Sequence, residues 1–224
     1  MTNAQLRAAC KGGFALDESA DDAFLTNAQW TRALNRGYRW ICRNAQLIAG
    51  KWTLTSVNGT REYALTGRSP SIAGLNMALF KQAGTTWRPL IRLPSEQLAP
   101  IVSQFHDTTG TPTHYWTRSD QLGLYPIPDS TNAGAYLELW GWAYPTALSG
   151  DSDTPAIEES LHEWLIDPAR YEMARQLTMQ GRPDGQALVA MYDRARQEAL
   201  AECIAYVRQL DDSPQYSNWA GEDF

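Results

Sequence analysis

The chain has 224 residues, of which 43% are hydrophobic and 20% are charged, and its formal net charge at neutral pH is −6. This composition indicates a globular protein rather than a disordered one, and the length allows one large domain or two small ones. The negative charge disfavours a free-standing nucleic-acid binder, and we find neither a signal peptide nor an apolar run of about 20 residues that could cross a bilayer.

Two helices are predicted before residue 50. Thr2 and Gln5 have the spacing of a capping box, at the start of a short helix that the glycines at 12–13 would end. Thr26 also has a glutamine three positions on, and it predicts a longer helix that ends at Gly50. The apolar face of this longer helix recurs every three or four residues: Trp30, Leu34, Tyr38, Ile41, Cys42, Ala45 and Ile48.

Four arginines lie largely off that apolar face: Arg32, Arg36, Arg39 and Arg43. They form either a solvated basic face or a contact for an acidic partner, and the sequence leaves both interpretations open.

A hairpin is predicted next. Asn58-Gly59 is the dipeptide most typical of a type I′ turn, because both central residues of that turn need a positive φ. The register around such a turn sets these pairs: Val57 with Thr60, Leu54 with Tyr63, and Trp52 with Leu65. The larger apolar side chains then share one face of the hairpin, which is the pattern of a half-buried sheet.

Further strands are predicted at 72–80, 87–93, 114–118, 123–125 and 135–144, with a short helix at 95–105 that Pro100 disturbs. The middle of the chain is therefore predicted to be an antiparallel β unit.

The last third is predicted to be helical. Thr154 and Pro155 are typical of a helix start, Pro168 would break or kink that helix, and Asp167 is placed to cap its restart. A long helix is predicted at 185–210. Its apolar face consists of Leu188, Tyr192, Ala195, Ala199, Cys203, Tyr206 and Leu210.

The composition changes after this helix. Residues 211–224 contain four acidic residues, no basic ones and three aromatic ones. Such a segment either frays or folds onto a partner that its aromatic side chains anchor. On the second interpretation, the candidate partner-binding residues are Asp211, Asp212, Tyr216, Trp219 and Phe224.

These elements predict an α+β fold. Residues 1–50 together with 151–210 would form a helical bundle, and residues 51–150 an inserted antiparallel β domain that resembles a sandwich or barrel. Residues 211–224 would form an extended C-terminal arm.

The motifs of common enzymes and cofactor sites do not occur. There is no phosphate-binding loop and no nucleophile elbow. His162-Glu163 begins a zincin-like pattern, but the second histidine that zinc needs one turn later is replaced by Ile166. We therefore predict no catalytic, cofactor-binding or metal-binding residues. The cysteines are widely separated and are interpreted as buried small hydrophobes: Cys10, Cys42 and Cys203.

Two further pairs of polar residues are of types that bind calcium or take part in catalysis. Asp151 and Asp153 lie in a loop with too few oxygen ligands for calcium, and this loop is interpreted as a helix entry. His106 and His114 are more typical of surface or hydrogen-bonded histidines, but a catalytic triad is spatial, so a hydrolase with a dispersed site stays open as a third hypothesis.

The order of these features resembles the adaptor, or head-completion, proteins of tailed bacteriophages over roughly residues 14 to 210. The resemblance rests on the stretches 30–38, 61–65, 110–116, 122–129, 144–149 and 153–155. It implies a non-enzymatic structural virion protein that forms a ring, typically a dodecamer, below the portal. It also implies that the ring extends the DNA channel toward the tail without specific DNA binding.

The partners that this resemblance implies are the portal, other copies of the chain and a tail-side stopper or tail-completion protein, with no membrane. The C-terminal arm would engage the portal. The expected location is the virion neck, and the host cytoplasm before assembly.

The main alternative is a carbohydrate-binding module. Its basis is a set of tryptophans on predicted strands, where their rings could stack on sugars: Trp87, Trp116, Trp140 and Trp142.

Overall fold

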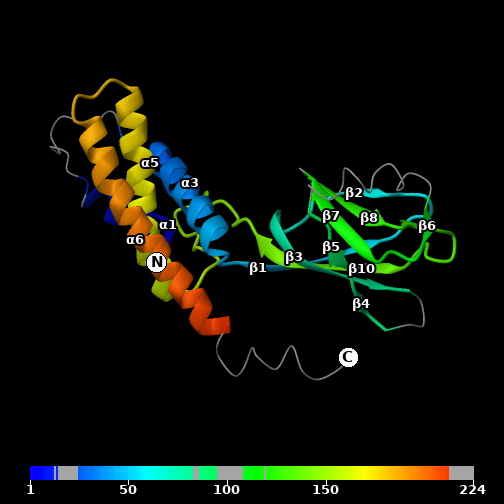
Figure 1. Cartoon of the computed structure of the whole chain (residues 1–224). Helices are drawn as coiled ribbons and strands as arrows, with labels where there is room; N and C mark the ends of the chain where they lie inside the picture. The colour runs from blue at the N-terminus through cyan, green and yellow to red at the C-terminus, as the bar shows by residue number, and fades with distance from the viewer. Residues whose placement is uncertain (13, 15–24, 83–85, 95–107, 119, 212–224) are drawn as a thin grey trace. The chain divides into compact units, whose positions relative to one another are not determined.

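The computed structural model describes residues 1–12, 14, 25–82, 86–94, 108–118 and 120–211. The chain divides into two compact units (Figure 1). One is helical and comprises Met1–Ile48 and Tyr144–Phe224, and the other is built of strands and comprises Ala49–Ala143. The predicted α+β class is confirmed.

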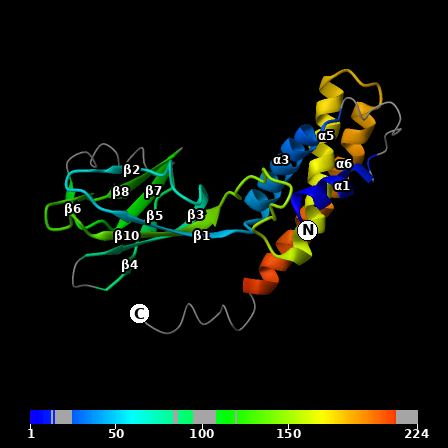
Figure 2. The same ribbon diagram turned by 180° about the vertical axis from the view of Figure 1, so that it is seen from behind.

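The elements of the helical unit are α1 (Asn3–Gly12), α3 (Asn27–Ala45), the 3₁₀-helix η1 (Glu159–Leu165), α5 (Ile166–Met179) and α6 (Gly185–Asp211). Helices α3, α5 and α6 lie side by side in both views of the molecule (Figures 1 and 2). The predicted short helix at 95–105 lies outside the described residues.

Both predicted capping boxes are confirmed. The backbone N–H of Gln5 donates to the Thr2 hydroxyl, and the Gln5 side chain accepts from the Thr2 N–H at 2.8 Å. Thr26 and Gln29 make the same reciprocal pair at the start of α3. The first N–H groups of a helix have no acceptor within the helix, and each capping box provides acceptors for two of them.

The long predicted helix ends earlier than expected. Helix α3 stops at Ala45, because Gln46 adopts the left-handed conformation with φ 57° and its N–H donates to the carbonyl of Cys42. Gly50, which was predicted to end the helix, lies instead within strand β1 (Ala49–Thr55). A left-handed cap is usually a glycine, and here a glutamine adopts it, so the sequence pattern did not indicate this helix end.

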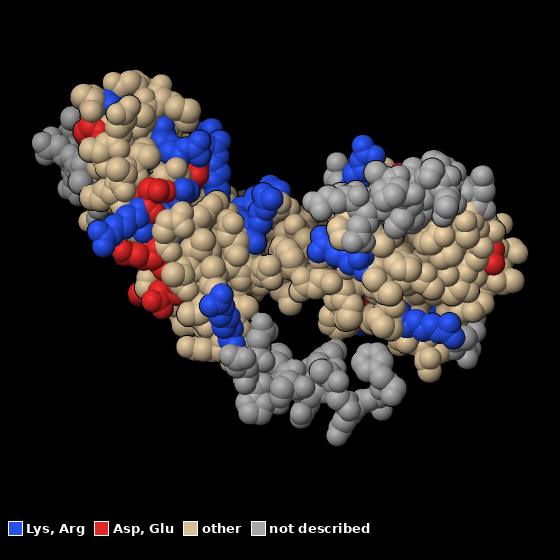
Figure 3. All heavy atoms as spheres, in the orientation of Figure 1, with Lys and Arg blue, Asp and Glu red and all other residues tan. Residues whose placement is uncertain are grey.

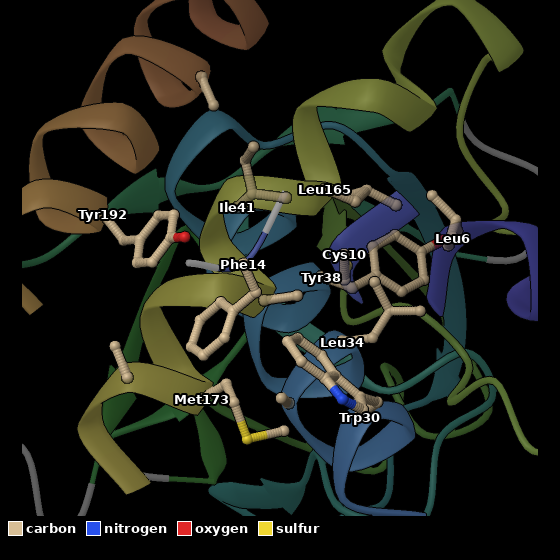
Figure 4. Close-up of a cluster of buried hydrophobic side chains, with 14 of the residues drawn as sticks. Leu6, Cys10, Phe14, Trp30, Leu34, Tyr38, Ile41, Leu165, Met173 and Tyr192 are labelled. Carbon is tan, nitrogen blue, oxygen red and sulfur yellow. The ribbon is translucent and has the colours of Figure 1, made fainter. Parts of the chain in front are cut away.

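The helical core forms where the apolar faces of four helices meet (Figure 4). Leu6, Trp30, Leu34, Tyr38 and Ile41 are at most 1% exposed. The Phe14 ring stacks on Tyr192 of α6 with centroids 5.3 Å apart and meets Trp30 edge-on at 5.2 Å. Most of the apolar face predicted for each of α3 and α6 is buried in this core, whereas Leu210 at the end of α6 is 37% exposed.

The predicted start of the last helical region is wrong. No helix begins at Thr154, and the first helical residue after this point is Glu159. The intervening loop is committed to other partners: the carbonyls of Asp151 and Asp153 accept from the first N–H groups of α1, and the Ala156 N–H donates to the Tyr38 hydroxyl at 2.6 Å. Those backbone groups cannot also form a helical turn.

The break predicted around Pro168 is real but lies two residues earlier. Helix α5 starts at Ile166, so Pro168 occupies its first turn, where a missing N–H costs nothing. Asp167 does not cap this helix; its carboxylate pairs with Arg170 at 3.1 Å, and the N-cap Leu165 makes no side-chain hydrogen bond.

The strand unit contains β1, β2 (Glu62–Ala64), β3 (Ile72–Lys81), β4 (Arg88–Pro89), β5 (Ile91–Arg92), β6 (Thr109–Gly110), β7 (His114–Arg118), β8 (Gln121–Tyr125), β9 (Ile127–Pro128) and β10 (Tyr136–Ala143). They form sheets in the orders β1-β10-β3-β4, β2-β8-β7-β5 and β6-β9. The two four-stranded sheets lie in separate layers (Figure 1), and over the described strands no barrel closes. Most pairs are antiparallel, and β5·β7 and β6·β9 are short parallel pairs.

The predicted hairpin around Asn58-Gly59 is wrong. Strand β1 pairs with β10 and strand β2 with β8, so the two strands belong to different sheets. The turn itself exists, since the Thr60 N–H donates to the Val57 carbonyl at 3.1 Å. Of the two central residues of this turn, Gly59 has a positive φ of 70° and Asn58 does not, which excludes a type I′ turn and fits type II. The predicted burial of the apolar side chains is confirmed for Trp52, Leu54 and Tyr63.

Candidate partner-binding surface

The five partner-binding residues predicted from sequence lie at the end of the chain. Asp211 is the last residue of α6, and Asp212, Tyr216, Trp219 and Phe224 lie outside the described residues. The structure therefore does not test whether they form one site. A further candidate lies on the described surface of helix α3.

Of the three histidines, His106 lies outside the described residues, and the other two are held by hydrogen bonds. His162 is buried, its Nε2 lies 3.1 Å from the carbonyl of Ile157, and its Nδ1 lies 2.7 Å from the amino group of Met1. A carbonyl only accepts, so Nε2 is the donor in that contact, and both ring nitrogens are held by structural partners. His114 contacts the Thr113 hydroxyl at 2.8 Å. Within the described ranges no three His, Cys, Asp or Glu side chains gather as a metal site would need.

The Asp151–Asp153 loop is also structural. The Asp153 carboxylate accepts from the N–H groups of Ser149 at 2.7 Å and of Gly150 at 2.8 Å, and these bonds lower its pKa. Asp151 pairs with Arg7 at 2.5 Å. Both carboxylates thus fix the loop that receives the start of α1.

The exposed face of α3 carries a row of arginines. Arg36, Arg39 and Arg43 are spaced three and four residues apart, so they project from one side of the helix, and all three are exposed. Basic side chains gather along the α3 side of the helical unit (Figure 3). Helical periodicity places the charges on this side because the opposite side is apolar and buried in the core.

A cleft of about 650 Å³ opens along this row, and we call it the arginine cleft. It lies within the helical unit and is bounded by α3, α5 and the chain just after β10. Its lining residues are Arg36, Arg39, Trp40, Arg43, Asn44, Tyr144, Glu172 and Arg175.

Aromatic rings hold the arginines of the cleft and its rim in place. The Arg39 guanidinium lies 4.0 Å from the centroid of the Tyr144 ring, a cation–π contact. Arg196 of α6 lies 4.7 Å from the Trp40 ring and 3.5 Å from the Tyr171 ring, and its guanidinium also pairs with Asp193 at 2.6 Å. Stacked guanidinium groups keep their N–H donors at the edge free to bind an anion.

The cleft carries an excess of positive charge. Four arginines line it against one carboxylate, Glu172, which contacts Arg175 at 3.4 Å. Among the described residues, Arg36 and Arg43 have no salt-bridge partner. The guanidinium fork matches carboxylate and phosphate oxygens, so the surface suits an acidic partner.

Sequence reasoning identified part of this surface and missed the rest. The three arginines on α3 were recognised as either a solvated face or a contact for an acidic partner. Arg175, Glu172 and Tyr144 were missed, because they come from segments more than 100 residues away and only folding brings them beside α3.

The tryptophans proposed for sugar binding do not form one platform. Trp116 is 6% exposed, and the Trp142 ring lies against Gly74 of the neighbouring strand. The Trp140 indole donates to Glu138 at 2.7 Å and lies 4.7 Å from the Lys51 ammonium. The Trp87 ring lies 5.4 Å from the Lys81 ammonium. These rings are used for packing and for contacts with charges in the same unit.

Comparison with known protein families shows where the chain belongs. The family described as SU10 adaptor protein matches residues 4–218, which spans both units of the structure. The chain belongs to the SU10 adaptor family. The resemblance to head-to-tail adaptors of tailed phages is thereby confirmed, and it extends over nearly the whole chain.

No curated protein matches the chain. Membership of the SU10 adaptor family supports a structural role in a bacteriophage particle, with other head or tail proteins and further copies of the chain as the kind of partner. Among its described helices, this adaptor has none that is both long and apolar enough to cross a membrane.

Proposed function

We propose that this protein is the adaptor that forms a ring below the portal, connects the phage head to the tail and extends the DNA channel. It is a structural virion protein and not an enzyme. The observation that carries this proposal is the family match over residues 4–218, because it includes both units rather than one shared module. The ring is a dodecamer located in the virion neck, and its subunits come from the host cytoplasm.

Three partners follow from this role. The portal lies on the head side, a stopper or tail-completion protein on the tail side, and identical subunits on either flank. DNA passes through the ring without specific binding. The net charge of −6 supports this last point, because a channel that lets DNA slide gains from few phosphate contacts.

The arm at 211–224 docks onto the portal. Tyr216, Trp219 and Phe224 are the anchors, since aromatic side chains contribute most of the binding energy in many interfaces. Asp211 and Asp212 at the start of the arm complement basic groups on the portal. A segment with so few aliphatic residues has no core of its own and gains order from its partner.

Light scattering tests the assembly. The purified chain is measured by itself and mixed with the portal of the same phage. We expect a monomer that becomes a large complex of fixed stoichiometry once the portal supplies a template. A chain that stays monomeric and does not bind the portal would contradict the proposal.

Variants of the arm test its role in the same assay. Removing residues 212–224, or replacing Tyr216 and Trp219 together with alanine, should abolish portal docking. Ser217→Ala, between the two aromatic residues, is the matched control and should dock normally. Unchanged docking of the trimmed chain would show that another surface engages the portal, while leaving the ring itself in place.

A further inference from the structure

The arginine cleft has a complementary segment in its own chain. We propose that, before assembly, the acidic segment 212–224 docks in the arginine cleft of the same molecule. The site is an interaction surface on the helical unit, and its occupant is a peptide whose carboxylates bind guanidinium groups. This inference does not require that the arm binds the portal.

The cleft supplies the donors. Arg36 and Arg43 are exposed and have no ion pair among the residues that the structure describes, while the exposed Arg39 stacks on the Tyr144 ring. A cleft of about 650 Å³ with these side chains accommodates several peptide residues rather than a single small ion. The aromatic walls at Trp40 and Tyr144 add surfaces on which another ring can stack.

The segment supplies the matching groups. Residues 212–224 contain three carboxylates, Asp212, Glu222 and Asp223, and no basic side chain. The three surplus positive charges of the cleft thus equal in number the three carboxylates of the segment. Tyr216 and Trp219 lie between the two acidic ends, where their rings can reach the aromatic walls.

The reach is sufficient. Cys42, next to Arg43, and Cys203 of α6 are buried in the same core cluster, where α3 and α6 are in contact. From Cys203 the helix continues eight residues to Asp211, which is about 12 Å at 1.5 Å per residue. A segment of 13 residues can extend over roughly 45 Å. The segment therefore leaves α6 close enough to the cleft to bind it with slack.

Tethering determines whether the segment that occupies the cleft comes from the same chain or from a neighbouring one. Individual exposed ion pairs are weak, so a free acidic peptide would occupy the cleft only at high concentration. Attachment to α6 instead gives an effective concentration of about millimolar. In a dilute solution of monomers the segment of the same molecule is thus the favoured occupant. A partner that binds the segment must first displace it from the cleft.

Disulfide trapping in the full-length chain tests this docking. Asn44 lines the cleft and is exposed, and Ser217 lies between Tyr216 and Trp219, so Asn44→Cys and Ser217→Cys form the reporter pair. The native cysteines are buried and do not compete. We expect an intrachain disulfide under mild oxidation, detected by intact mass and by mobility on a non-reducing gel. Its rate should fall steeply from about 0.05 M to about 0.5 M salt, because exposed ion pairs are screened.

Charge reversal provides the control. Arg36→Glu with Arg43→Glu should slow cross-linking about fivefold, because two exposed ion pairs are lost. Arg32→Glu with Arg194→Glu changes the net charge equally but lies outside the cleft, and it should leave the rate unchanged. Thermal unfolding of each variant verifies that it is folded.

Three results would overturn the proposal. Failure of the reporter pair to cross-link would show that the segment does not visit the cleft. An equal rate in both charge-reversal variants would reduce the contact to random collision of a tethered chain. A disulfide that forms only between chains would assign the cleft to the segment of a neighbouring copy.

Discussion

Gly37 marks the closest approach of two helices in the helical unit. A Cβ at this position of α3 would lie 2.7 Å from the backbone nitrogen of Ala169 and 2.7 Å from the carbonyl carbon of Pro168, both in α5. Backbone atoms cannot move aside as a flexible side chain can. Gly37→Ala is therefore expected to force the helices apart and to destabilise the fold by about 1–3 kcal/mol.

Urea unfolding measures this loss, and Gly12→Ala is the control. A Cβ at Gly12 would meet nothing within 4 Å, so that variant should unfold at the wild-type midpoint or slightly above it. Equal stability of both variants would contradict the close packing of α3 against α5. The alternation of apolar residues could not have identified Gly37, because its neighbours are about 130 residues away.

The three thiols make stability depend on alkaline pH. Burial raises the pKa of Cys10 from 9.0 to about 12 and that of Cys203 to about 11, and it also raises the pKa of Cys42. In the unfolded chain these thiols ionise near their ordinary pKa. Their contribution to stability is thus complete below about pH 9 and is lost as the pH rises toward the folded values, by at most about 1.4 kcal/mol per pH unit for each thiol.

The measurement is the urea midpoint from about pH 7.5 to about pH 10.5, the range in which the thiols of an unfolded chain ionise. Cys10→Ala should show a smaller decrease across this window than the wild type, although the variant is less stable at neutral pH. Identical slopes would show that the Cys10 thiol ionises equally easily in both states. The sequence interpretation of the cysteines as small buried hydrophobes is confirmed.

Helix α3 carries both the core and the arginine row, so its first turn is an informative place to test an element. The Thr26 hydroxyl accepts a hydrogen bond from the Gln29 N–H, and the Gln29 side-chain oxygen accepts one from the Thr26 N–H. Thr26→Ala removes one half of this box and should cost about 1 kcal/mol.

Thr26→Ser is the matched variant, because it keeps the hydroxyl and should retain wild-type stability. Thermal unfolding compares the two. If alanine and serine behave alike, the capping bond contributes nothing measurable and the start of α3 is held by core packing instead. The box was predicted from local spacing, which is why sequence reasoning succeeded here.

Strands show where local reasoning fails. The alternation around Asn58-Gly59 correctly identified Trp52, Leu54 and Tyr63 as buried. It could not identify their partners, because a two-layer fold offers the same buried face to a strand in either sheet. In the structure Leu54 lies beside Leu137, and Trp52 beside Leu139, both from β10 more than 80 residues later. Those partners give β1 a longer apolar row than β2 could.

At the scale of the whole molecule, family resemblance and local pattern were complementary. The resemblance identified the class of protein, and periodicity identified the helical faces that form the core. Neither the resemblance nor the periodicity could predict the arginine cleft, since its walls come from α3, α5 and Tyr144. A charge pattern on one helix reveals half of such a site, and the other half depends on which helix packs beside it.

The last prediction concerns DNA, which the proposed ring must surround without holding. Non-specific binding requires several phosphate contacts and the release of their counterions, and a chain with a net charge of −6 offers few. The full-length protein should therefore bind a short duplex no more tightly than about 100 μM at roughly 50 mM salt. Fluorescence anisotropy measures this, and a micromolar affinity that weakens steeply with salt would show that the protein grips the backbone.

Removing residues 212–224 makes the same assay more informative. The deletion takes away three carboxylates and no basic residue. If the segment covers the arginine cleft, the trimmed chain exposes the cleft and should bind the duplex more tightly at low salt. Arg36→Glu with Arg43→Glu in the trimmed chain should remove that gain. A gain that survives this reversal would place the exposed charge elsewhere, because only those arginines have changed.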